Sequence, residues 1–96
     1  MISNVDLINA FINGQEKQNG SMRTNGTKLY SYATCIAQKT ADGILFNVCK
    51  YSCTTSKQQY YVRRALEKHG RNFTEVGKDK HIPRGTYDLT RYHKAA

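Results

Sequence analysis

The apolar residues near the start of the chain recur with a helical period over residues 3–13. Ser3 or Asn4 can cap this segment, and Gly14 can end it. A helix this short does not persist alone, so we expect its apolar face to pack on the rest of the protein. The residues predicted to form that face are Val5, Ile8, Phe11 and Ile12.

An alternating pattern with two turn dipeptides follows the polar residues 15–21, which we expect to form a loop. Asn25-Gly26 and Asp42-Gly43 are typical of tight hairpin turns, because both favour a positive φ. Three antiparallel strands in meander order are therefore predicted. They cover residues 21–24, 28–38 and 44–52.

The side chains of the predicted strands alternate between two faces. In the third strand, Ile44, Phe46 and Val48 share one face, and Leu45, Asn47, Cys49 and Tyr51 share the other. In the second strand, Tyr30 and Tyr32 compete with Leu29 and Cys35 for the interior. The pattern does not decide which of these two faces is buried.

A second helix is predicted to begin at "TTS", with Thr54 or Thr55 as N-cap, and to end at Gly70. Residues 72–76 are typical of a short strand at the sheet edge. The predicted buried stripe of the helix comprises Tyr61 or Val62, Ala65, Leu66 and His69.

These elements predict an α+β fold with the order α-β-β-β-α, three antiparallel strands or four with residues 72–76, and both helices on one face. A chain of 96 residues is expected to form a single domain, here residues 1–76. Residues 77–96 are polar and basic, and we expect a loosely packed arm or edge hairpin. Its apolar anchors are Ile82, Tyr87, Leu89 and Tyr92.

The charge is strongly positive and uneven. The net charge is +8 and the pI is near 9.6. Counted along the sequence, residues 1–27 are neutral, residues 28–56 carry +2 and residues 57–96 carry +6. A basic domain with clustered charge fits a polyanionic partner. The alternative is that the lysines and arginines only keep the protein soluble.

Three cysteines, no signal-peptide pattern and no run of about 20 apolar residues favour a reduced, cytoplasmic location without membrane contact. Enzymatic activity is not expected. Cys53 is the only cysteine beside a predicted helix start, and no histidine is near it in sequence. The acids are scattered, and neither a phosphate loop nor regular metal-ligand spacing occurs. We therefore expect no cofactor and no metal.

A binding surface remains, centred on the start of the second helix, where free amides attract anions. The partner expected is nucleic acid, DNA or RNA, or a host nucleoprotein, bound by a monomer or a homodimer. The alternative is that "TTS" is only a cap and the arginines are a solvated helix face. The candidate residues are Lys50, Thr55, Ser56, Lys57, Tyr60, Arg63, Arg64, Lys78, Lys80 and Arg84.

The order of elements over residues 3–70 resembles the double-stranded RNA-binding domain. In that family the start of the second helix contacts phosphates across the major groove. Here "TTSKQQYYVRR" stands at that place, without the family's lysine-rich run, and the first helix lacks the family's usual glutamate.

A second resemblance lies in the sequence itself. "LYSYATCIAQ", then "DG", then "KYSCTTSKQQ", over about residues 20–66, is similar to a set of small phage-encoded proteins of unknown function. The resemblance implies a phage or mobile-element accessory protein. Such proteins often act by binding, including binding to CRISPR effectors. A counter-defence inhibitor that docks on a host effector protein or ribonucleoprotein is therefore the alternative function, with Tyr60, Tyr87 and Tyr92 as candidate contacts.

Overall fold

The structure is a computed structural model that describes residues 2–41, 43–51, 53–78 and 81–92. Over these residues it contains two α-helices, one sheet and a short 3₁₀ helix. The elements in chain order are α1 (Asn4–Ile12), β1 (Glu16–Gln18), β2 (Met22–Asn25), β3 (Lys28–Ser31), β4 (Thr34–Thr40), β5 (Gly43–Asn47), α2 (Cys53–Lys68), β6 (Phe73–Val76) and η1 (Thr90–Tyr92).

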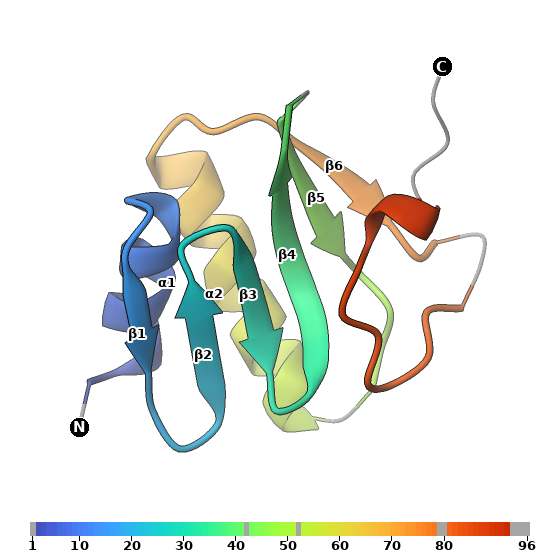
Figure 1. The fold of residues 1–96 in the computed structure, drawn as a ribbon, viewed down its shortest axis with the longest axis horizontal. Coiled ribbons are helices and arrows are strands. Elements are labelled where there is room, and N and C mark those ends of the chain that lie inside the picture. The colour runs from blue at the N-terminus through green and yellow to red at the C-terminus, as the bar shows by residue number, and fades with distance from the viewer. Residues whose placement is uncertain (1, 42, 52, 79–80, 93–96) are drawn as a thin grey trace.

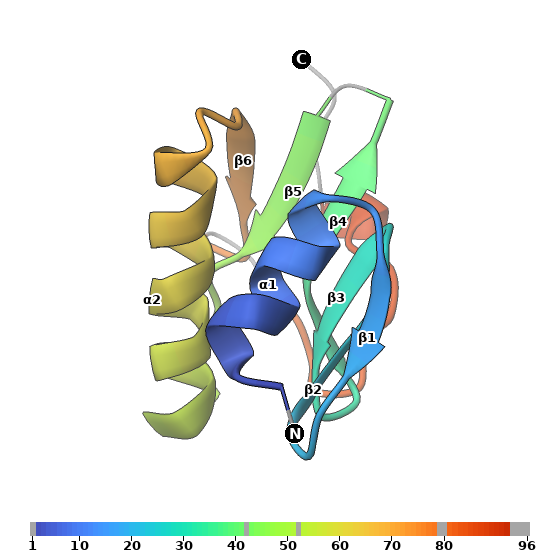
Figure 2. The same cartoon turned by 90° about the vertical axis from the view of Figure 1, so that its left-hand side faces the viewer.

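The sheet has six strands in the order β1-β2-β3-β4-β5-β6, and both helices lie on one side of it (Figures 1 and 2). Neighbouring strands are antiparallel except β5 and β6, which are parallel. The α2 helix connects these two strands, as a parallel pair requires. The predicted α+β class is confirmed, but the three-stranded α-β-β-β-α arrangement is wrong. The likeness to the double-stranded RNA-binding domain therefore does not extend to the topology.

Two features that the sequence pattern hides produce the additional strands. The strand β1 lies within the expected loop, and all three of its residues are exposed, so no apolar residue marks it. The predicted strand at residues 28–38 is a hairpin, in which Ser31 pairs with Thr34 around a turn at Tyr32 and Ala33. Tyr32 has a φ of 55°, a conformation in which glycine or asparagine is usual. The turn therefore carries no typical signal.

The helix α1 forms where it was predicted. The Ser3 hydroxyl accepts a hydrogen bond from the Asp6 amide at 3.1 Å, so Ser3 is the N-cap. Gly14, with a φ of 76°, follows the last turn. Val5 was expected inside but is 49% exposed. The buried residues are Leu7, Ile8, Ala10, Phe11 and Ile12.

The helix α2 begins earlier than predicted, at Cys53. Thr54 and Thr55 therefore lie in the first turn, and neither is the N-cap. Val62 and Leu66 are buried as expected, and Gly70 follows the helix end with a φ of 65°. The expected burial of His69 is wrong, and Tyr61, the alternative to Val62, is 45% exposed.

The main core fills the space between the helices and the sheet, and it includes Phe11, Leu29, Phe46 and Leu66. The predicted division of β5 is confirmed. Ile44 and Phe46 face this core, whereas Leu45 belongs to a second cluster on the other side of the sheet. Tyr30 packs against the second cluster, and Tyr32, in the turn between β3 and β4, is 60% exposed.

The C-terminal segment covers part of the sheet face opposite the helices (Figure 2). Ile82 and Leu89 have no exposed surface. The Cys35 amide donates to the Thr86 carbonyl at 2.7 Å. The segment is thus anchored on the sheet through Ile82 and Leu89, two of the four apolar anchors named from the sequence. Residues 93–96 lie outside the described residues.

Candidate functional site

Two buried glutamines fix the orientation of α2 on the sheet. Gln58 accepts a hydrogen bond from the Ser31 hydroxyl and donates to the Ser21 hydroxyl at 3.0 Å. Gln59 donates to the main-chain carbonyl oxygens of Asn47 and Cys49, at 2.7 and 2.9 Å. Because buried polar groups need such partners, these bonds hold this side of the helix inward and leave the opposite side in solvent.

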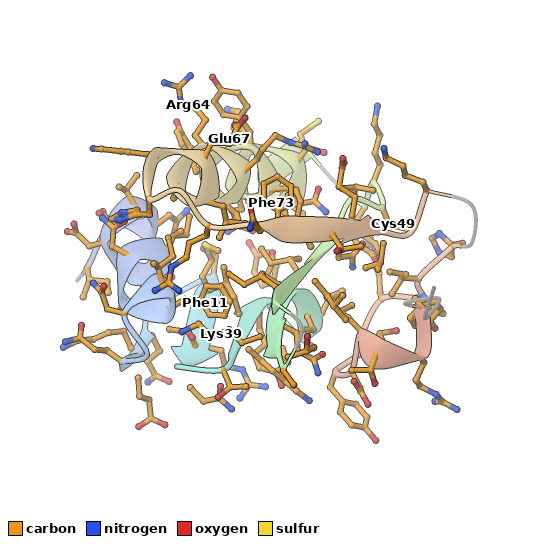
Figure 3. All side chains as sticks on the ribbon, turned by 90° about the horizontal axis from the view of Figure 1, so that it is seen from above. Phe11, Lys39, Cys49, Arg64, Glu67 and Phe73 are labelled. Atoms are coloured by element: carbon orange, nitrogen blue, oxygen red, sulfur yellow. The ribbon has the colours of Figure 1, made fainter. Side chains whose placement is uncertain are left out.

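The solvent side of α2 combines positive charge with aromatic rings. Its residues recur every three or four positions, so they share one face. Tyr60 is 54% exposed and contacts Tyr61 edge-on, with 5.7 Å between ring centroids. Arg64 lies over the Tyr60 ring, donates to its hydroxyl at 3.1 Å and points away from the sheet (Figure 3). We call this surface the cationic face: Lys57, Tyr60, Tyr61, Arg64 and Lys68.

A shallow depression of about 210 Å³ lies beside the cationic face. Four of its lining residues belong to the predicted site, and they come from α2 and from the segment that follows β5. Phe46, Val48 and Gln59 complete the lining. The predicted residues that the fold brings together here are Lys50, Ser56, Tyr60 and Arg63.

Arg63 has a structural role in addition to lining the depression. It donates to the Glu75 carboxylate at 2.8 Å, and its guanidinium lies 5.2 and 5.8 Å from the ring centroids of Phe46 and Phe73. Lys78 also approaches Glu75, at 3.4 Å. One carboxylate therefore offsets part of the charge of two cations at the β6 side of α2.

Other predicted residues lie apart from this surface. Thr55 is 5% exposed, and its hydroxyl is 3.3 Å from that of Ser31, so it faces the core. Arg84 donates to the Tyr51 carbonyl at 2.7 Å, in the segment packed on the opposite side of the sheet. Lys80 lies outside the described residues. Of the three hydroxyl groups in "TTS", that of Thr55 therefore faces the core, whereas Thr54 and Ser56 are exposed.

The candidate contacts named from the sequence did not include Tyr61 and Lys68. Tyr61 was one of two alternatives, with Val62, for the buried stripe of the helix. The spacing of Lys57, Tyr61, Arg64 and Lys68 is the signal that could have identified the face. The apolar part of the depression, Phe46 and Val48, depends on how α2 packs, and no sequence pattern reveals it.

Two of the three cysteines, Cys35 and Cys49, are buried in the sheet side of the fold. Burial raises the pKa of the Cys35 thiol to about 12, so it is not a nucleophile near neutral pH. Cys49 is 5% exposed; its sulfur accepts the Ile82 amide at 3.2 Å and lies 4.0 Å from His81 Nδ1. This thiol holds the C-terminal segment to the sheet.

The described parts of the chain hold neither a cluster of metal ligands nor a membrane-spanning helix. No group of three or more histidine, cysteine or acidic side chains is close enough there to hold a metal ion. Neither described helix has both the length and the apolar character needed to cross a membrane.

Comparison with known proteins places the chain in a family but gives no activity. No curated protein matches it, and no solved structure matches it. The family described as a family of unknown function, DUF8033, matches residues 7–88, which include every element except α1's first turn and η1. The chain therefore belongs to the DUF8033 family.

Proposed function

We propose that this protein binds nucleic acid through the cationic face of α2. The observation that carries the proposal is the exposure of Lys57, Arg64 and Lys68 on one side of one helix. Among the described residues, both ion pairs use Glu75, so no described carboxylate neutralises these three cations. Their charge is available to a phosphate backbone.

The dimensions of the face suit a polyanion. Lys68 lies eleven positions after Lys57, which corresponds to about 16 Å along the helix. Phosphates on one strand of a duplex follow at about 3.4 Å along its axis, so the face spans several of them. The helix carries four cationic residues and one acidic residue, Glu67. Tyr60 and Tyr61 add rings and hydroxyl groups that can contact sugars, phosphates or bases.

This proposal shifts the site along the helix relative to the sequence hypothesis. Thr55 is buried, so the hydroxyl groups of "TTS" do not act together at the helix start. The contacts instead come from the cationic face on the side of the helix, which lies beside the depression that Lys50 and Ser56 line. Competition between unlabelled DNA and RNA for the same binding site on the protein shows which of the two is the preferred partner.

The salt dependence of binding tests the proposal. Fluorescence anisotropy of a labelled oligonucleotide should show log affinity falling with log salt, by about 0.9 per phosphate neutralised on duplex DNA. Lys57→Ala combined with Arg64→Ala should weaken binding and lower this slope by about 2. The control, Lys17→Ala with Arg91→Ala, removes the same charge from exposed positions outside α2. Equal effects of the two double variants, or an affinity independent of salt, would contradict the proposal.

A second candidate is a counter-defence inhibitor that docks on a host effector protein or ribonucleoprotein. The phage or mobile-element origin suggested by the sequence resemblance motivates it. Exposed neighbouring tyrosines favour it, because tyrosine and arginine are common at the energetic centres of protein interfaces. Tyr60, Tyr61 and Arg64 form such a group. Retention of one host protein after nuclease treatment, lost in Tyr60→Ala, would favour this candidate over nucleic-acid binding.

A further inference from the structure

The depression beside the cationic face differs in character from the face itself. Phe46 and Val48 supply an apolar surface, whereas Lys50, Ser56 and Tyr60 supply one charge and two hydroxyl groups. Phe46 is 1% exposed, so its ring is held in the core and only its border reaches the depression. A ligand that fits must combine an apolar part with a negative charge.

Arg63 gives the depression a flat surface that is held in place. Its guanidinium is fixed by the hydrogen bond to Glu75 and by the rings of Phe46 and Phe73. The side chain is nevertheless 39% exposed. Guanidinium planes and tyrosine rings are the surfaces on which proteins stack unpaired bases. Tyr60, one turn earlier on α2, lines the same depression.

The size of the depression also permits such a ligand. Its volume of about 210 Å³ corresponds to roughly seven water molecules at about 30 Å³ each. This is room for one ring system but not for a base pair. A base within a duplex is stacked and paired, and it reaches a pocket only after leaving the helix. Lys50 lines the depression, and Lys57 follows the lining residue Ser56 in the sequence. Both lysines are exposed, so their charge can offset that of the phosphate attached to the base.

We propose that this depression holds one unstacked base of a single-stranded nucleic acid, beside Arg63 and Tyr60, with its phosphate at Lys50. The inference rests on the proposed nucleic-acid binding and adds to it a preference for single strands. The cationic face contacts the backbone, and the depression receives a base. Because every base has an aromatic face, this contact requires no particular sequence.

A matched pair of variants tests the inference. Ser56→Trp places a large side chain in the mouth of the depression, and Thr54→Trp makes the same change two residues away, at an exposed α2 position outside the lining. Both are exposed, so neither should disturb the core. The probes are a labelled thymidine single strand of about 12 nucleotides and a duplex of the same length. Affinity for each probe is measured by anisotropy.

The wild-type protein should bind the single strand more tightly than the duplex. Ser56→Trp should lose roughly 5- to 150-fold in single-strand affinity, the range of one base stack, and keep its duplex affinity. Thr54→Trp should keep both affinities. If Ser56→Trp binds the single strand as the wild type does, the depression holds no base, while nucleic-acid binding by the cationic face stands.

Two other outcomes would also overturn the inference. If the wild-type protein binds neither probe at low salt, the proposed function fails and the inference fails with it. If an acidic tyrosine-containing peptide binds, and Ser56→Trp abolishes only that binding, the depression is a peptide site. Both outcomes differ from the result in which the protein binds the duplex but not the single strand. That result would show that the cationic face binds nucleic acid and that the depression holds no base.

Discussion

Arg63 in the middle of α2 donates a hydrogen bond to Glu75 in β6 at 2.8 Å. The contact joins the crossover helix to the edge strand that follows it, over the rings of Phe46 and Phe73. Arg64, the next residue, points away from the sheet and contacts only Tyr60 among the bonds described for it. The two adjacent arginines therefore have different roles: Arg63 links parts of the fold, and Arg64 faces solvent.

This difference predicts separate effects of the two alanine substitutions. Arg63→Ala removes an ion pair and two ring contacts, so we expect a loss of about 1 kcal/mol in the free energy of unfolding. Arg64→Ala should change it by less than about 0.5 kcal/mol, because it removes only an exposed side chain. Urea denaturation measures both. In duplex binding, which uses the cationic face, the order should reverse, with Arg64→Ala more damaging after correction for the folded fraction. Equal losses of stability would contradict the assignment.

Glu75 also predicts a dependence of stability on pH. The hydrogen bond from Arg63 holds the pKa of Glu75 below its ordinary value of 4.5. A carboxyl whose pKa is lowered in the folded protein stabilises it at pH above the unfolded pKa, and this contribution is lost as the pH falls through the folded pKa. The free energy of unfolding should therefore decrease as the pH drops below about 4.5.

Glu75→Gln provides the comparison for this pH effect. The amide does not titrate, so the variant should be less stable than the wild type near pH 7, and the difference should shrink toward about pH 3. Some pH dependence will remain, because hydrogen bonds from Thr90 lower the pKa of Asp88 as well. Urea midpoints across this pH range measure the effect. A difference that stays constant with pH would show that folding does not lower the pKa of Glu75.

The features recognised from the sequence are those with a local physical requirement. The turn at Gly26, with a φ of 92°, and the end of α1 at Gly14 were predicted because few other residues adopt these conformations. The alternation in β5 was also recognised, because the two sides of this strand face two apolar clusters. In these segments, local conformation and burial carry the same information.

The features that were missed depend on tertiary contacts. Thr55 resembles a helix cap in sequence, but α2 begins at Cys53 and turns the threonine toward Ser31. Gln58 resembles a surface residue, yet it is 1% exposed because two serines satisfy its amide. Because these polar residues hold one side of α2 toward the core, the opposite side of the helix is the exposed face. Their partners are 24 to 37 residues away in the chain, so no local pattern indicates them.

The buried Gln58 predicts an unusual sensitivity at a polar position. Gln58→Leu nearly conserves volume but leaves Ser31 and Ser21 without their glutamine partner. We expect a loss of about 1–3 kcal/mol in the free energy of unfolding, the cost of unpaired buried polar groups. Gln18→Leu makes the same change on the exposed strand β1, and it should cost less than about 0.5 kcal/mol. Equal effects in urea denaturation would mean that Gln58 does not fix α2.

The C-terminal segment predicts a contrast between two neighbouring apolar residues. Leu89 is fully buried against the second cluster, and its amide donates to the Gln38 side chain at 2.7 Å. Leu89→Ala should lower the free energy of unfolding by about 2–5 kcal/mol, the usual cost of truncating a core leucine. Tyr87 is 70% exposed, and its ring has a cation contact with Lys28 at 5.4 Å. Tyr87→Ala should therefore cost less than about 1 kcal/mol.

Urea unfolding of the two variants distinguishes a structural segment from a detachable arm. A segment that belongs to the fold unfolds together with the sheet, so Leu89→Ala should shift the single transition of the whole domain. In a detachable arm, loss of the Leu89 contacts would leave that transition in place. Since Ile82 and Leu89 cover Cys35 and Leu45 in the middle of the sheet, we expect the first result. If the unfolding transitions of Leu89→Ala and Tyr87→Ala have the same urea midpoint, the C-terminal segment does not unfold together with the core that holds α2 in place.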